Sequence, residues 1–184
     1  MYKRLILILG GARSGKSEYA QHLAGLYGES ILYVATAQAD DDEMKLRIAT
    51  HKDTRPAHWQ TLEATSRVGK AISSLIYQAD VVLLDCFTLL ASNIISSLDE
   101  PITHEMAEKA INTELDDLLA TYRSEKRVWI IVSNEVGLGL VPPYPLGRVY
   151  RDALGRANQR IAAEADEVIF MVAGLPMFLK GEKL

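Results

Sequence analysis

The sequence contains a single cysteine, Cys86, among its 184 residues. One cysteine excludes a framework of disulfides within the chain and is typical of a protein that works in a reducing compartment. No apolar stretch approaches the roughly 20 residues that a membrane-spanning helix needs. The basic and apolar start, residues 2–9, is too short for a signal peptide and runs directly into a glycine-rich loop. We therefore expect a soluble, cytoplasmic protein.

The sequence also lacks an excess of basic residues, because its formal net charge is −4. A protein without a broad basic surface is not expected to bind nucleic acid. The guanine-reading tetrapeptide NKxD of regulatory GTPases is absent, and the DxxG sequence at residues 152–155 falls inside a helical pattern rather than after a strand. A regulatory GTPase is therefore disfavoured.

What the sequence does contain is a phosphate-binding loop between residues 10 and 17. The pattern GxxxxGK[ST] is matched by Gly10, Gly11, Ala12, Arg13, Ser14, Gly15, Lys16 and Ser17. An apolar run at residues 5–9 precedes it and a helical pattern follows, which is the context that this motif requires. Glycines let the backbone N–H groups turn inward around a polyphosphate, Lys16 is expected to reach the β- and γ-phosphates, and the Ser17 hydroxyl is expected to bind Mg²⁺.

Apolar runs alternate with helical patterns along the rest of the chain. Strands are expected at residues 5–9, 31–35, 81–85, 128–132 and 168–172, the last of these being the final strand. Helical patterns follow the glycine-rich loop and recur near residues 40–51, 68–76, 88–98, 106–122 and 148–160. This alternation predicts an α/β fold, a single P-loop (RecA-like) domain over residues 1–184 with a mainly parallel central sheet flanked by helices.

Asp85 ends the apolar run at residues 81–85, as the acid of a Walker B strand does. Mg²⁺ prefers oxygen ligands, so a hydroxyl from Ser17 and a carboxylate from Asp85 at adjacent strand ends would suit it. The alternative is that Asp85 only caps the end of its strand.

His51 lies in a segment with basic neighbours, Lys52 and Arg55. The spacings HxxxH and HExxH of metal sites are absent from this segment. A neutral imidazole is a competent nucleophile toward phosphorus, and the flanking cations suit a polyphosphate. The alternative is that His51 caps a helix or fills a packing position.

Many short motifs together resemble one enzyme family along nearly the whole chain. They include GGARSGKS at residues 10–17, YVATA at 33–37, DDEM at 41–44, HK at 51–52, LDC at 84–86, SNEVG at 133–137 and NQ at 158–159. The sequence is similar to the bifunctional adenosylcobinamide kinase / adenosylcobinamide-phosphate guanylyltransferase family of cobalamin biosynthesis. The resemblance implies phosphorylation of adenosylcobinamide with ATP or GTP, followed by transfer of GMP from GTP to adenosylcobinamide phosphate through a guanylyl-histidine, with release of pyrophosphate.

The resemblance also implies roles for individual residues. His51 is similar to the guanylylated histidine, and position 50, which is a second histidine in some relatives, is Thr50 here. Further positions that resemble GTP contacts are Ala35, Thr36, Ala37, Lys52, Asp53, Thr54, Arg55, Glu63 and Asp85. The family resemblance implies a homotrimer.

Two other functions share the phosphate-binding loop. A monofunctional small-molecule kinase of the P-loop class would use the same loop without a guanylylated histidine. An ATP-driven binding module of the RecA-like type would use Glu135, at the end of the strand predicted at residues 128–132, to polarise water. Such a module hydrolyses ATP without a corrinoid, whereas the guanylyltransferase leaves a covalent nucleotide on the protein.

Overall fold

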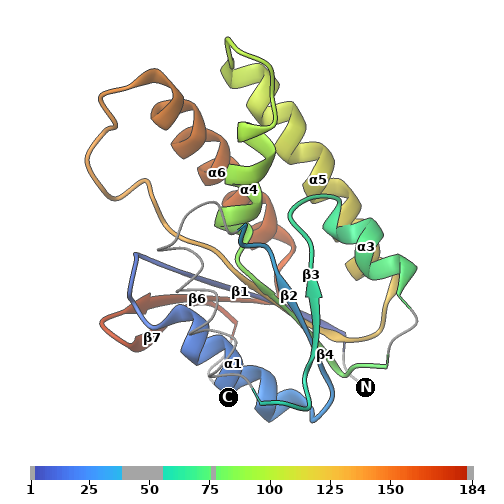
Figure 1. Cartoon of the computed structure of the whole chain (residues 1–184). Helices are drawn as coiled ribbons and strands as arrows, with labels where there is room; N and C mark the ends of the chain where they lie inside the picture. Colours follow the sequence, from blue (N-terminus) through green and yellow to red (C-terminus); the bar gives the residue numbers. More distant parts are fainter. Residues whose placement is uncertain (1–2, 39–55, 76–77, 182–184) are drawn as a thin grey trace.

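The structure, a computed structural model, describes residues 3–38, 56–75 and 78–181. In these segments the strands form one seven-stranded sheet with the order β3-β2-β4-β5-β1-β6-β7 (Figure 1). The strands are β1 (Arg4–Gly10), β2 (Ile31–Ala35), β3 (Gln60–Glu63), β4 (Val81–Asp85), β5 (Val128–Val132), β6 (Glu167–Val172) and β7 (Leu175–Lys180). Neighbours pair in parallel except β6 and β7, which are antiparallel. The predicted mainly parallel α/β fold is confirmed.

Helices cover both faces of this sheet. The described helices are α1 (Lys16–Tyr27), α3 (Val68–Ser74), α4 (Phe87–Ser96), α5 (His104–Ser124) and α6 (Pro145–Glu164). Helix α1 lies on one face, and α3, α4, α5 and α6 lie on the other (Figure 1). A parallel sheet needs such crossover helices, and they bury both of its faces.

Strand β1 divides its side chains between the two cores. Leu5 and Leu7 pack with the core under α4, α5 and α6, whereas Ile6 and Ile8 pack with the core under α1. All four are fully buried, as the two-residue repeat of a strand between two helical layers requires. The continuous apolar run therefore places the loop that follows at the middle of the carboxyl edge of the sheet.

Two edge strands were not predicted from the sequence. Strand β3 is short and mostly exposed, and β7 contains Pro176 in an otherwise apolar run. Proline is tolerated in an edge strand, where one row of backbone N–H groups has no partner strand. The strand at residues 168–172 is therefore not the last one. The helix expected near residues 40–51 lies outside the described residues.

None of the helices in the described segments is long and apolar enough to cross a membrane. The helix predicted at residues 68–76 ends earlier, at Ser74, and the helix predicted at 148–160 extends over Pro145–Glu164. Pro145 occupies the first turn of α6, where the missing N–H costs nothing.

Candidate functional site

The glycine-rich loop connects β1 to α1, as the sequence predicts. Gly10 and Gly15 have φ angles of 153° and 90°, which disfavour any residue with a Cβ atom. Gly15 is also the N-cap of α1, so the loop ends at the positive end of a helix. The backbone N–H groups at this helix start are suited to an anion.

The turn between β6 and β7 braces this loop. Ala173 and Gly174 have φ angles of 51° and 81°, as the two central residues of a type I′ hairpin turn do. The backbone N–H of Gly174 donates to the carbonyl of Ser14 at 3.0 Å. A Cβ atom on Gly15 would lie 3.2 Å from the Cα of Gly174. The turn near the end of the described chain thus holds the loop near its beginning in place.

The side chain of Lys16 folds back over the loop. Its ammonium donates to the carbonyl of Gly11 at 2.5 Å and lies 3.4 Å from the hydroxyl oxygen of Ser14. Only 7% of Lys16 is exposed. Burial lowers the pKa of this ammonium, and the nearby Cys86 and Asp85 oppose that shift. A polyphosphate would give this buried cation the negative partner that the loop itself lacks.

Several predicted site residues lie side by side at the carboxyl ends of β2, β3 and β4. Ala35 of β2 pairs with Glu63 of β3 on one side and with Asp85 of β4 on the other. One expectation is corrected here: β4 does not adjoin β1, because β5 lies between them. Asp85 therefore approaches the loop across one intervening strand, about 10 Å in sheet spacing.

Asp85 has a specific partner on β2. The hydroxyl of Tyr33 donates to Asp85 Oδ2 at 2.9 Å. Tyr33 was quoted from the sequence only as the first residue of the YVATA motif and was given no role, since an aromatic residue in an apolar run is indistinguishable there from core packing. No hydrogen bond to the second oxygen, Oδ1, is found among the described residues, and Ser17 is half-buried at the start of α1.

Thr36 ties β2 to β4 just beyond their ends. Its hydroxyl donates to the carbonyl of Cys86 at 2.7 Å and accepts from the N–H of Cys86 at 3.0 Å. The carbonyl of Thr36 accepts from the amide of Asn93 on α4 at 2.9 Å. Thr36 is fully buried and its side chain is committed to Cys86, whereas the adjacent Ala37 is half-buried.

Cys86 follows Asp85 directly. Burial raises the pKa of its thiol to about 11, and the negative charge of Asp85 adds to the rise. The thiol is therefore neutral near pH 7, which agrees with a packing role beside the strand end rather than with nucleophilic chemistry.

His51, Lys52, Asp53, Thr54 and Arg55 lie outside the described residues. Just after these residues, His58 is exposed and Trp59 packs against the core under α1.

A buried polar network fixes the end of β5 to the helices above it. The hydroxyl of Ser133 donates to Asn158 Oδ1 of α6 at 2.8 Å, and Asn158 Nδ2 donates to the carbonyl of Asn134 at 3.1 Å. The N–H of Asn134 donates to the hydroxyl of Thr88 on α4 at 2.6 Å. The next residue, Glu135, donates its own N–H to the carbonyl of Gly10 at 3.0 Å. Sequence reasoning placed this segment at the ligand-binding edge but did not find its link to α6.

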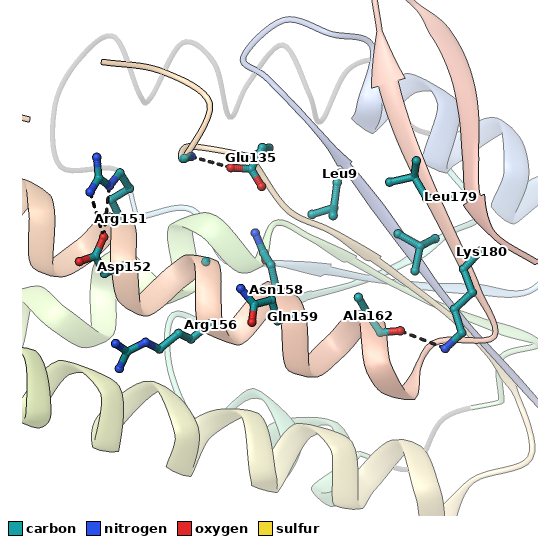
Figure 2. A pocket seen from close by; sticks show the side chains of 13 residues that line it. Leu9, Glu135, Arg151, Asp152, Arg156, Asn158, Gln159, Ala162, Leu179 and Lys180 are labelled. Atoms are coloured by element: carbon teal, nitrogen blue, oxygen red, sulfur yellow. Dashed lines mark hydrogen bonds and ion pairs between the residues drawn. The ribbon is translucent and has the colours of Figure 1, made fainter. Parts of the chain in front are cut away.

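A cavity of about 650 Å³ lies beside this network, between α6 and strands β1, β6 and β7 (Figure 2). Leu9 and Glu135 line the end next to the glycine-rich loop, and Leu179 and Lys180 of β7 line another side. The cavity opens on the face of the sheet opposite to α1. The loop and the cavity thus meet at the first residue of the motif, Gly10.

Comparisons with known proteins agree on one family. A family model described as "Cobinamide kinase / cobinamide phosphate guanyltransferase" matches residues 6–179. The "Bifunctional adenosylcobalamin biosynthesis protein CobU" of Salmonella typhimurium is 42% identical over 181 residues, covering 96% of this chain and 99% of that protein. The "Bifunctional adenosylcobalamin biosynthesis protein CobP" of Pseudomonas aeruginosa is 44% identical over 178 residues, covering 97% and 98%.

A solved structure shares the fold. The flagellar accessory protein FlaH from Methanocaldococcus jannaschii superposes with a TM-score of 0.54 at 15% identity, covering 98% of this chain and 80% of that one. At that identity the likeness supports the arrangement of the sheet and helices alone.

Proposed function

This chain belongs to the cobinamide kinase / cobinamide phosphate guanyltransferase family, and on that premise we propose that it phosphorylates cobinamide and then attaches GMP to the product. The observation that carries the proposal is a near full-length match to bifunctional relatives together with an intact phosphate-binding loop at the carboxyl edge of the sheet. We further propose that residues 1–184 act as one domain.

In the kinase step, the glycine-rich loop would hold the polyphosphate of ATP or GTP. The hydroxyl oxygen of the cobinamide side arm would attack the γ-phosphorus and lose its proton to water. The bond from the γ-phosphorus to the bridging oxygen would break, and the nucleoside diphosphate would leave with that electron pair. The ammonium of Lys16, released from the carbonyl of Gly11, neutralises the charge that grows on the phosphate oxygens.

The residues present fit a magnesium ion. A hydroxyl from Ser17 and the Oδ1 oxygen of Asp85 are hard oxygen ligands, and Mg²⁺ is commonly bound by one or two protein groups together with substrate phosphates. Tyr33 orients the carboxylate by its hydrogen bond to Oδ2. When bound, the ion would neutralise phosphate charge.

In the transferase step, His51 would act as the nucleophile. An imidazole nitrogen attacks the α-phosphorus of GTP, pyrophosphate leaves, and the resulting phosphoramidate passes GMP to a phosphate oxygen of cobinamide phosphate. Lys52, Asp53, Thr54 and Arg55 would contact the GTP beside His51, and Ala35, Thr36, Ala37 and Glu63 would complete its site at the ends of β2 and β3.

The assembly would be a homotrimer. Support comes from β7, an edge strand on which Leu175 and Met177 are both more than half exposed. An exposed apolar edge strand is a surface that partner chains commonly cover. Light scattering on the purified protein would measure the mass, and a monomer would contradict the assembly.

The function is tested by incubating the protein with base-labelled GTP, denaturing it and measuring bound GMP. We expect an adduct that is labile in acid, as a phosphorus–nitrogen bond to imidazole is. His51→Ala should lose the adduct and keep cobinamide phosphorylation. His58→Ala is the matched control, because His58 is exposed in the adjoining segment. No adduct with the parent protein, but phosphorylation of cobinamide, would favour the monofunctional kinase.

A further inference from the structure

The cavity beside α6 is not used by any step described above. It begins at Leu9 of β1, next to the glycine-rich loop, and at Glu135, which follows β5 and donates its N–H to the carbonyl of Gly10 in that loop. A ligand that fills the cavity therefore reaches the phosphate site from the face opposite to α1. This is the position that an acceptor needs if its side arm is to meet the end of the polyphosphate.

The cationic residues that line the cavity are largely compensated by neighbours. Arg151 donates to Asp152 at 3.2 Å, and Arg156 pairs with Glu108 of α5. Lys180 donates to the carbonyls of Ala162 and Ala163, near the carboxyl end of α6, at 3.1 and 3.0 Å. A cavity whose cations are already occupied is poorly suited to a second polyphosphate. It favours a neutral ligand that both donates and accepts hydrogen bonds.

The remaining lining combines apolar walls with one uncommitted amide. Leu9, Val168 and Leu179 supply apolar surface. Gln159 is exposed, and its side chain makes no hydrogen bond to any residue in the described segments. A primary amide has two donors and an acceptor, so Gln159 is complementary to another primary amide.

Hydrogen bonds hold the α6 side of the cavity to the segment that follows β5. Asn158, which neighbours Gln159 on α6, is only 5% exposed and is held by Ser133 and by the carbonyl of Asn134. These two bonds fix the distance between α6 and the end of β5. A site built on a helix and strands held in this way is preorganised for its ligand.

We propose that this cavity binds the neutral amide-bearing edge of the corrinoid acceptor, with Gln159 hydrogen-bonded to one of its primary amides. The proposal rests on the proposed function, since cobinamide carries primary amides and methyl groups around its ring. A cavity of about 650 Å³ takes part of such a ligand and leaves the rest, with the reacting arm, toward Glu135 and the loop.

Equilibrium dialysis of cobinamide, followed by its visible absorbance, tests the proposal directly on the full chain. Gln159→Leu keeps the size of the side chain and removes its hydrogen bonds. Gln21→Leu is the matched control, because it removes a glutamine amide in the same way from α1 on the other face of the sheet. We expect Gln159→Leu to weaken cobinamide binding about tenfold, a loss of about 1.4 kcal/mol, with the affinity for GTP within twofold of the parent.

A second ligand tests whether the contact with Gln159 is made by a primary amide of cobinamide. A cobinamide analogue with methyl esters in place of its side-chain amides should bind the parent more weakly than cobinamide does. In the Gln159→Leu variant this difference should shrink, because the partner of the amide is gone. An unchanged affinity for cobinamide in Gln159→Leu, or an undiminished difference between the two ligands, would overturn the proposal.

The same assays separate this proposal from the proposed function. A parent protein that phosphorylates cobinamide while Gln159→Leu behaves identically contradicts the cavity alone. A parent protein that neither binds nor phosphorylates cobinamide contradicts both.

Discussion

Lys16→Ala should lower the rates of both reactions strongly while disturbing the fold only slightly. The ammonium is 7% exposed and donates to the carbonyl of Gly11 at 2.5 Å. Loss of a hydrogen bond to a charged group costs about 1.5–3 kcal/mol. Burial lowers the pKa of Lys16, however, because removing the ammonium from water costs free energy. The alanine variant no longer carries this desolvation cost. These two contributions oppose each other, and we expect a net change in unfolding free energy below about 1 kcal/mol.

The loss of transition-state stabilisation is larger than the change in unfolding free energy, because no opposing contribution offsets it. A preorganised group that faces developing charge contributes about 3–4 kcal/mol to the transition state, or a factor of about 10²–10³ in rate. One loop holds the polyphosphate for both reactions, so both should fall by that factor. The melting temperature should change by less than about 4 °C for a chain of this size.

The assay measures cobinamide phosphorylation and protein-bound GMP separately, with a thermal melt of each variant. Lys70→Ala is the control, since Lys70 is exposed and makes a surface ion pair with Asp117 at 3.1 Å. Kinase turnover within a few-fold of the parent would refute the role of Lys16. Loss of the GMP adduct with intact kinase turnover would refute the idea that one loop serves both steps.

Three further predictions concern the strand ends and the hairpin turn. Asp85→Asn should lower Mg²⁺-dependent turnover more than nucleotide affinity measured by calorimetry, and equal losses would indicate a structural cap. The pKa of the Cys86 thiol is raised from 9.0 to about 11, which leaves about 100-fold less thiolate at pH 8 than an ordinary thiol has. Iodoacetamide should therefore alkylate Cys86 slowly. A rate equal to that of a free cysteine would contradict the burial of the thiol. Ala173→Asn should stabilise the protein by about 0.5–1 kcal/mol, because Asn-Gly suits a type I′ turn, and an unchanged or lower melting temperature would contradict that assignment of the turn.

The sequence was most informative where local chemistry decides the structure. Strands β1, β2, β4 and β5 are continuous apolar runs, and their positions follow from that pattern with little error. The glycine-rich loop was also found, because its residue types and spacing are dictated by the approach of a backbone to phosphate.

What the sequence could not supply was the order of the strands. That β5 separates β4 from β1 depends on pairing between segments far apart in the chain, and no local pattern records it. The same holds for Tyr33 beside Asp85 and for Asn158 beside Ser133, which are contacts between different elements. Strand β7 was missed because its proline and exposed side chains depart from the pattern of a buried strand.

The hydrogen bond from Gly174 to Ser14 joins segments that are synthesised at very different times. During synthesis the glycine-rich loop emerges among the first segments, whereas the hairpin that supports it is the last described element to leave the ribosome. A nascent chain that ends before β6 carries the complete motif but lacks the partner that holds it in shape. A chain truncated in that way should therefore bind nucleotide more weakly than the whole chain does.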